Sequence, residues 1–312
     1  MVALFTADEI LYSTHGRIAA GGIDDHKGRL VWDLEDIQTG DWFLALAYGA
    51  VDTHDYLSMA FEMGAHGCLV NRRSRYSFAP KGRTLISVAE TSVALLELVS
   101  YWRHAVHPTT VGVAGSMGRR ATIELIHHLL RNSIKCHVAF DGGGFGCASD
   151  VLSMPEGTEL LLFEAGAVER GDVARMGSAL APNIAVITRT QHPLPSVKRD
   201  AQIAALYCEI LETVNRFNCG SAVVYDENPA VRERCMQLLP GLVATMYSDR
   251  GDSVQTFSQA GVDSLCKQIE LVTEQPVMPA DLWCALEAAR AIGLSYEQIN
   301  AAIGKAVTAS SR

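Results

Sequence analysis

The stretch that decides the fold is Thr110-Val-Gly-Val-Ala-Gly-Ser-Met-Gly-Arg-Arg-Ala-Thr122. It opens as a short buried strand, turns at Gly115 and Gly118, and continues into apolar residues at helical spacing from Ala121 to Arg131. A strand, a glycine turn and a helix in this order can bind phosphate, because backbone N–H groups at a helix N-terminus attract anions. The alternative is a tight turn that packs closely and needs no ligand.

On both sides of this loop, short apolar runs alternate with amphipathic segments. We expect strands at 42–46, 67–70, 84–88, 159–163, 184–188 and 221–225. We expect helices at 91–104, 171–180, 199–217 and 229–238, and two more between 279 and 303. Ser295 and Gln298 form a capping box for the last helix. The alternation predicts an α/β fold with a mostly parallel sheet covered on both faces.

The chain length and one boundary signal predict two domains. At 312 residues the chain exceeds the usual size of a single domain. The stretch His-Pro-Thr-Thr at 107–110 follows a predicted helix and is typical of a domain boundary. We therefore predict an N-terminal domain at 1–107 and a central domain at 109–312.

Composition excludes several classes of partner. A formal net charge of -9 argues against nucleic-acid or anionic-membrane binding, which depends on clustered Lys and Arg. The start of the sequence lacks the basic and apolar regions of a secretory signal, and no run reaches the length of a membrane span. The eight cysteines are scattered without metal-binding spacing and predict reduced core thiols. We expect a cytoplasmic protein without membrane insertion.

The segment 112–122 resembles the ATP loop of the Mur ligases, whose pattern is GxxGxxGK followed by Thr or Ser. Further segments match in order along nearly the whole chain, at 34–46, 52–65, 164–167, 181–188 and 279–303. The branch that these segments resemble is MurF, which adds D-Ala-D-Ala to the muramyl tripeptide. The resemblance implies a uridine-nucleotide-type domain at 1–107 and an ATPase-type domain at 109–312.

The same resemblance implies site residues. A nucleotide loop would consist of Gly115, Ser116, Met117, Gly118, Arg119, Arg120, Ala121 and Thr122. Substrate contacts would come from Asp52, Thr53, His54 and Asp55, although the pair His54 and Asp55 could instead brace a turn. Catalytic candidates are His192 and Glu164, and the alternatives are a loop histidine and a strand-end carboxylate that binds no metal.

The chain departs from the family at the residues that carry its chemistry. The loop lysine reads Arg119, and the hydroxyl that ligates magnesium reads Arg120. A guanidinium is a poor substitute for a compact ammonium, and a cation cannot ligate a metal. Tyr207 stands near the place of the family's carbamoylated lysine, and the paired asparagines expected after residue 140 are absent. The matched segments also end with the central domain, so we expect the C-terminal ligase domain to be missing.

These departures favour a catalytically inactive Mur-ligase-like protein, which acts as a binding or regulatory module. Its partner would be a nucleotide-type or other anionic small molecule, or a protein. The alternative is an ATP-dependent ligase of a carboxylate and an amine, in which Arg119 and Arg120 clamp the phosphates and a separate chain supplies the missing domain. We expect no tight magnesium site, with Glu164 as a weak candidate ligand, and ATP could bind without a normal magnesium site.

Overall fold

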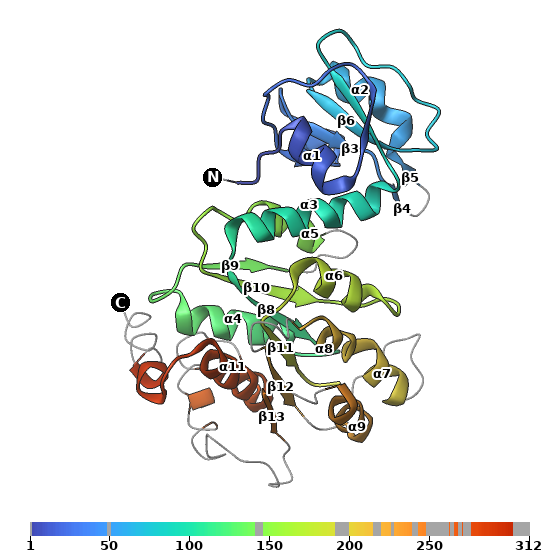
Figure 1. Ribbon diagram of the computed structural model, residues 1–312. Coiled ribbons are helices and arrows are strands. Elements are labelled where there is room, and N and C mark those ends of the chain that lie inside the picture. Colours follow the sequence, from blue (N-terminus) through green and yellow to red (C-terminus); the bar gives the residue numbers. More distant parts are fainter. Residues whose placement is uncertain are drawn as a thin grey trace. The chain divides into compact units, whose positions relative to one another are not determined.

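The computed structural model describes residues 2–48, 51–140, 146–190, 200–214, 220–225, 228–238, 243–247, 262, 265–267, 270 and 276–301 (Figure 1). The chain divides into two compact units. The first comprises Met1–Val106 and Val151–Glu156, and the second comprises His107–Asp150 and Gly157–Arg312. No helix within the described ranges is both long and apolar enough to cross a bilayer.

The predicted division at 107–109 misses one feature, since residues 151–156 return to the first unit. Two hydrogen bonds hold them there: Ala3 N donates to Leu152 O at 2.9 Å, and Trp102 Nε1 donates to Met154 O at 3.0 Å. Such contacts join residues about 50 or more positions apart in the sequence, as 102 and 154 are. No local pattern in the sequence indicates them.

The first unit contains a five-stranded sheet in the order β1-β7-β6-β3-β2. The bounds in that order are Arg17–Ala20, Thr84–Val88, Gly67–Asn71, Trp42–Leu44 and Leu30–Val31. Only the pairing of β1 with β7 is antiparallel within this sheet. A separate antiparallel pair consists of β4 (Ala47–Tyr48) and β5 (Val51–Asp52). The helices are α1 (Ala7–Thr14), η1 (Leu34–Asp36), η2 (Thr53–Tyr56), α2 (Leu57–Glu62) and α3 (Thr91–Val106).

Alternate strand residues explain how this sheet buries a core. Phe43, Cys68 and Leu85 point to one face and pack with Leu57 and Phe61 of α2. Because side chains alternate along a strand, Trp42 belongs to the opposite face, where it is fully buried and donates Nε1 to Phe5 O at 2.8 Å. The apolar runs read from the sequence at 42–46, 67–70 and 84–88 are therefore strands buried on both faces, as parallel sheets require.

The second unit contains a six-stranded sheet in the order β13-β12-β11-β8-β10-β9, and all five pairings are parallel. The bounds in that order are Val243–Tyr247, Ser221–Tyr225, Ile184–Ile187, Thr109–Ala114, Leu160–Ala165 and Cys136–Ala139. The helices are α4 (Arg119–Leu130), α5 (Gly146–Leu152), α6 (Asp172–Leu180), α7 (Asp200–Tyr207), α8 (Glu209–Thr213), α9 (Pro229–Leu238) and α11 (Pro279–Ile292).

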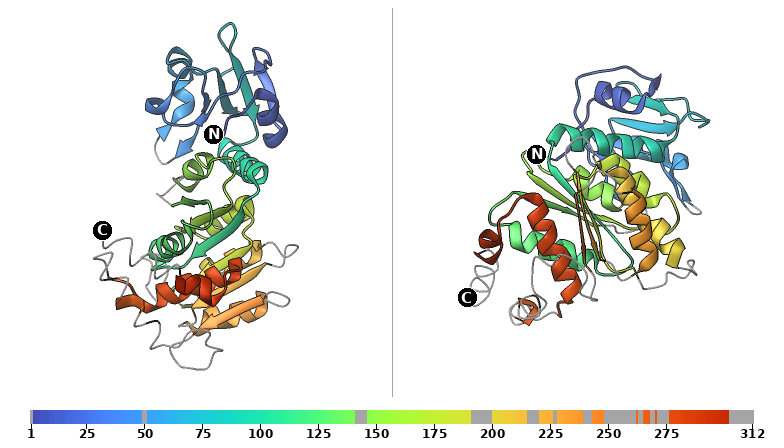
Figure 2. Two further views of the ribbon diagram at one scale, coloured as in Figure 1. Left: turned by 90° about the vertical axis from the view of Figure 1, so that its left-hand side faces the viewer. Right: turned by 60° about the horizontal axis from the view of Figure 1, so that its bottom comes forward.

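Helices cover both faces of this sheet, which confirms the predicted α/β class. Helices α4 and α11 pack together on one face, and α6 to α9 lie on the other (Figure 2). Val111, Val113 and Val186 face α4 and α11 and are fully buried. The capping box also forms, with Ser295 N donating to Gln298 Oε1 at 2.8 Å and Gln298 N donating to Ser295 Oγ at 3.2 Å.

One predicted helix is interrupted. The segment 199–217 was expected to be continuous, but α7 ends at Tyr207 and α8 begins at Glu209. The carboxylate of Glu209 is buried and accepts from Gly171 N at 3.0 Å and from Ala174 N at 3.3 Å, both at the start of α6. A carboxylate at a helix N-terminus is stabilised by the free N–H groups there. This contact between distant segments coincides with the break and is invisible to local sequence patterns.

Candidate functional site

The glycine loop between β8 and α4 lies at the carboxyl edge of the six-stranded sheet, because it follows the carboxyl end of β8, an interior strand that is parallel to both of its neighbours. Gly115 and Gly118 have φ angles of 143° and 82°, a region that favours glycine. A Cβ on Gly115 would lie 2.2 Å from Thr188 Oγ1, and one on Gly118 would lie 2.1 Å from Asp281 Oδ1. Both glycines are thus required by close neighbours, whether or not a ligand binds.

The first half of the loop bonds to the end of the neighbouring strand β11. Arg189 O accepts from Ser116 N at 3.0 Å and from Met117 N at 3.2 Å. The Arg189 guanidinium in turn donates to buried Asp281 at the start of α11, with Nη2 to Oδ2 at 3.0 Å. Since these two loop N–H groups bond to protein, an anion at this loop would have to bind further along, at the first turn of α4.

Arg119, the residue in the place of the family's lysine, turns inward. Its Nε donates to Glu164 Oε1 at 2.9 Å, and its guanidinium also donates to Gly115 O. Glu164 is the penultimate residue of strand β10 and its side chain is 9% exposed, while that of Arg119 is 22% exposed. Burial raises the pKa of Tyr207, and the adjacent Arg119 guanidinium opposes that rise. The structure therefore brings together Arg119 and Tyr207, at which the chain departs from the family pattern, and Glu164, at which it retains that pattern.

Arg120 does not share this arrangement. Its guanidinium carbon lies 4.1 Å from the centre of the Phe140 ring, and its Nε lies 3.4 Å from Glu124 Oε1. The side chain is 64% exposed. Of the two neighbouring arginines, Arg120 alone is therefore a solvated side chain at the helix start. Ala121 is exposed as well, whereas Thr122 is buried and its Oγ1 has no hydrogen-bond partner in the described part of the chain.

Two predicted site elements lie outside the described residues. His192 is one of them, together with Leu194 and Pro195 that follow it. The other is the segment 141–145, where the family's paired asparagines were sought.

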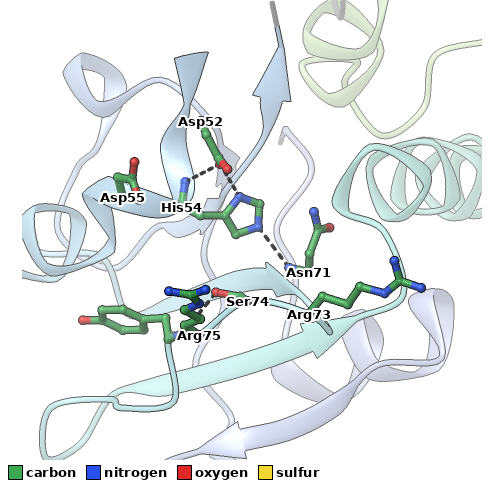
Figure 3. A pocket seen from close by; sticks show the side chains of 8 residues that line it. Asp52, His54, Asp55, Asn71, Arg73, Ser74 and Arg75 are labelled. Atoms are coloured by element: carbon green, nitrogen blue, oxygen red, sulfur yellow. Dashed lines mark hydrogen bonds and ion pairs between the residues drawn. The ribbon is translucent and has the colours of Figure 1, made fainter. Parts of the chain in front are cut away.

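A pocket of about 500 Å³ lies in the first unit, and it contains most of the predicted substrate residues (Figure 3). It is formed by the end of β5, the helix η2 and the chain that leaves β6, and the carboxyl end of a parallel strand such as β6 is where ligands of open α/β sheets bind. The lining residues are Asp52, His54, Asp55, Asn71, Arg73, Ser74, Arg75 and Tyr76. Thr53 is not among them, because its buried hydroxyl accepts from Leu46 N at 2.7 Å.

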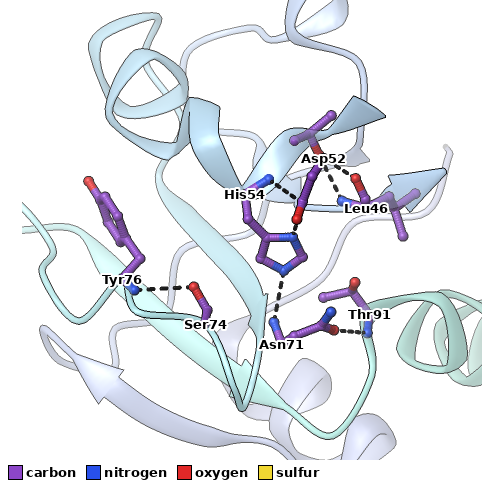
Figure 4. Close-up of polar contacts among 8 residues, drawn as sticks. Leu46, Asp52, His54, Asn71, Ser74, Tyr76 and Thr91 are labelled. Atoms are coloured by element: carbon purple, nitrogen blue, oxygen red, sulfur yellow. Dashed lines mark hydrogen bonds and ion pairs between the residues drawn. The ribbon is translucent and has the colours of Figure 1, made fainter. Parts of the chain in front are cut away.

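His54 is a structural brace in this pocket (Figure 4). Asn71 N donates to His54 Nε2 at 3.0 Å, so Nε2 carries no proton and Nδ1–H donates to Asp52 Oδ1 at 2.6 Å. Asp52 also accepts from His54 N at 3.0 Å, and this backbone bond is the main cause that lowers the pKa of Asp52. Both ring nitrogens of His54 are therefore engaged within the protein, which favours the turn-bracing alternative for this residue.

Replacing His54 should loosen the first unit. We expect His54→Ala to lower the free energy of unfolding by about 1–3 kcal/mol, because it leaves the partly buried Asn71 N–H without an acceptor. Chemical denaturation followed by circular dichroism measures the change. Asp55→Ala is the matched control, since Asp55 is exposed, and surface changes usually stay within about 0.5 kcal/mol. Equal losses in the two variants would contradict the bracing role.

Sequence reasoning missed four residues of these sites. Arg73 and Arg75 are exposed on opposite sides of Ser74, and within the described ranges neither side chain has an ion-pair partner (Figure 3). The run Asn-Arg-Arg-Ser-Arg-Tyr after a predicted strand was the available signal. Arg189 and Asp281 are 92 positions apart, and no local signal could have paired them.

Comparison with known proteins places this geometry in context. No protein-family model matches the sequence. The chain is 29% identical over 160 residues to the UDP-N-acetylmuramoyl-tripeptide–D-alanyl-D-alanine ligase of Bacillus subtilis, covering 50% of this chain and 34% of that protein. It is 23% identical over 277 residues to the ligase of the same name from Synechocystis, covering 87% and 60%. The chain thus spans between a third and three fifths of these two relatives.

Solved structures agree with the sequence relatives on the fold. MurF from Acinetobacter baumannii superposes with a TM-score of 0.79 at 18% identity, covering 97% of this chain and 68% of that one. MurF from Thermotoga maritima, solved with ADP, gives a TM-score of 0.62 at 22% identity, covering 72% and 51%. Both similarities extend over parallel sheets flanked by helices. In sequence and in fold, this chain therefore resembles the MurF branch of the Mur ligases.

Proposed function

We propose that this MurF-like protein binds a nucleotide-type or other anionic ligand and does not carry out ATP-dependent ligation. One observation carries the proposal: the guanidinium of Arg119 is bound to Glu164 and to the Gly115 carbonyl. Ligation of this type needs charge stabilised on a transferring phosphoryl group, by a lysine and a metal held in position. In this chain the side chain at the lysine position is bonded to the protein instead.

The pocket in the first unit is the proposed ligand site. Arg73 and Arg75 offer guanidinium donors, which bind phosphate oxygens in pairs of parallel hydrogen bonds. Asp55 offers an acceptor for a hydroxyl or N–H group. A ligand with phosphates at one end and hydroxyl or amide donors at the other matches this set, and nucleotides have that composition.

The second candidate function is an ATP-dependent Mur-type ligase with a modified phosphate loop. The printed names of the sequence relatives favour it, since they are ligases. Arg119 would then bind phosphates directly, through the guanidinium N–H groups that Glu164 and Gly115 do not use. In that case ATP would bind without a normal magnesium site, and a protein partner would supply the functions of further domains.

The binding proposal predicts a specific loss in the pocket. UDP-N-acetylglucosamine, as a probe, should raise the melting temperature of the natural chain, because a ligand of the native state stabilises it by mass action. The double substitution Arg73→Ala with Arg75→Ala should weaken this binding at least about a hundredfold, since each charge-assisted contact contributes roughly 1.5–3 kcal/mol. Titration calorimetry measures the affinities, and ATP and ADP with and without magnesium serve as further probes.

Arg72→Ala is the matched control, because Arg72 is an exposed arginine of the same loop that does not line the pocket. An equal loss of affinity in this variant would indicate a general charge effect and not a site. If none of the nucleotides raises the melting temperature, the proposed ligand class is wrong.

A further inference from the structure

We propose that the guanidinium of Arg119 is a tethered cation that stands beside Glu164 in the place of a divalent metal, so that the phosphate-type loop excludes magnesium. The inference rests on the proposed loss of ligation and gives it a physical cause. It concerns metal binding, which can be measured separately from any nucleotide or any product.

The first argument is that Glu164 already has its cation. A buried carboxylate stays ionised only when a positive charge or several hydrogen bonds compensate for lost hydration. Glu164 is buried, and Arg119 Nε lies 2.9 Å from its Oε1. Magnesium binds carboxylate oxygen at about 2.0–2.1 Å with a complete octahedral shell, most of it water. A guanidinium in direct contact with the same carboxylate group leaves little room for that shell and repels the ion.

The second argument is that the other expected ligands do not replace what is lost. Arg120 stands where the resemblance places the metal-binding hydroxyl, and it lies against Phe140. The nearest hydroxyl on α4 is that of Thr122, which follows by two residues and therefore projects about 200° around the helix. Among the residues that the structure describes, no group of three His, Cys, Asp or Glu side chains is placed to hold a metal.

The third argument comes from Tyr207. The resemblance places an anionic carbamoylated lysine near this position, where this chain has a fully buried phenol. Burial raises the pKa of this phenol, so it stays neutral, and the positive neighbour Arg119 does not reverse the direction. Arg119 and Glu164 therefore lie side by side as a neutral pair next to a neutral phenol, and this pair needs no further ion.

The test is to remove the tethered cation and look for a metal site that appears. Arg119→Gln keeps a polar side chain, shorter than that of arginine, and removes its charge. We expect the natural chain to bind Mn²⁺ with an affinity that Glu164→Gln does not change. We expect Arg119→Gln to gain one Mn²⁺ site at least about tenfold tighter, a gain that the double substitution with Glu164→Gln abolishes. Electron paramagnetic resonance of free Mn²⁺ measures the occupancy.

A second measurement keeps the proposal falsifiable if Arg119→Gln folds poorly. Glu164→Gln alone leaves Arg119 without its carboxylate, so its melting temperature should fall further than that of the double substitution. Two results would overturn the proposal: tight Mn²⁺ binding by the natural chain that depends on Glu164, or a double substitution no more stable than Glu164→Gln and without any gain of metal in Arg119→Gln. Neither result depends on ligation, so the proposed function fails or stands on its own assay.

Discussion

No ligation product is expected when this chain is supplied with ATP, magnesium, a muramyl-tripeptide precursor and D-Ala-D-Ala. The reaction must stabilise charge on a transferring phosphoryl group. In the pattern that this chain resembles, a lysine and a metal-binding hydroxyl do so, and this chain has Arg119 and Arg120 at those two positions. Each such group typically supplies several kcal/mol of transition-state stabilisation. Loss of both should slow the reaction on the order of ten-thousandfold or more, which coupled phosphate release and product chromatography can measure.

The informative control is the double substitution Arg119→Lys with Arg120→Thr. Arg119→Lys has a shorter side chain and would leave part of the Glu164 carboxylate available to a metal. Arg120→Thr would restore a hydroxyl to the loop. We expect this variant to gain magnesium-dependent ATP binding that the natural chain lacks. If the natural chain hydrolyses ATP at a rate typical of enzymes, and Arg119→Ala abolishes that activity, the non-catalytic proposal is wrong and the arginine is a working phosphate ligand.

Asp281→Ala should produce the largest stability change of any single substitution considered for the second unit. Asp281 is 3% exposed, and its carboxylate binds the guanidinium of Arg189, whose carbonyl in turn holds the glycine loop. Removal of one partner of a buried ion pair leaves a buried charge without compensation. The expected loss is about 3–5 kcal/mol of unfolding free energy.

Chemical denaturation followed by circular dichroism measures the loss, and tryptophan fluorescence adds a local reporter in this unit. The sequence has four tryptophans, and Trp283, two residues from Asp281, is the one that follows residue 107. Asp281→Asn keeps an acceptor for Arg189 and should lose less, and Glu124→Ala, which breaks an exposed pair with Arg120, should lose about 0–1 kcal/mol. A loss in Asp281→Ala as small as that of Glu124→Ala would show that the pair does not hold the loop.

Much of the fold follows from the sequence alone, because its strands are continuous apolar runs. Strands β6, β8 and β11 are buried along most of their length on both faces, so their residues are mostly apolar and easy to find. Strand β9 was missed, since it lies at a sheet edge and its burial is mostly partial. Edge strands need fewer apolar residues, so their pattern is weaker.

The sites were less accessible to sequence reasoning. The positions of Arg119 and Glu164 were identified, but their contact was not, because it joins residues 45 positions apart. The sequence also could not tell that neighbouring arginines would diverge, with Arg119 inward and Arg120 against Phe140. The orientation of a side chain on the first turn of a helix depends on which strand ends lie around that turn. The order of the strands in the sheet determines which ends these are.

The return of residues 151–156 to the first unit has a consequence for how such a chain can evolve. The polypeptide passes between the two units three times, after residues 106, 150 and 156. A gene cut after residue 106 would encode a fragment without the carbonyls of Leu152 and Met154, which accept Ala3 N and Trp102 Nε1. Buried donors without acceptors are costly. Exchange of the first unit between relatives by a single crossover is therefore disfavoured, and the two units should be inherited together.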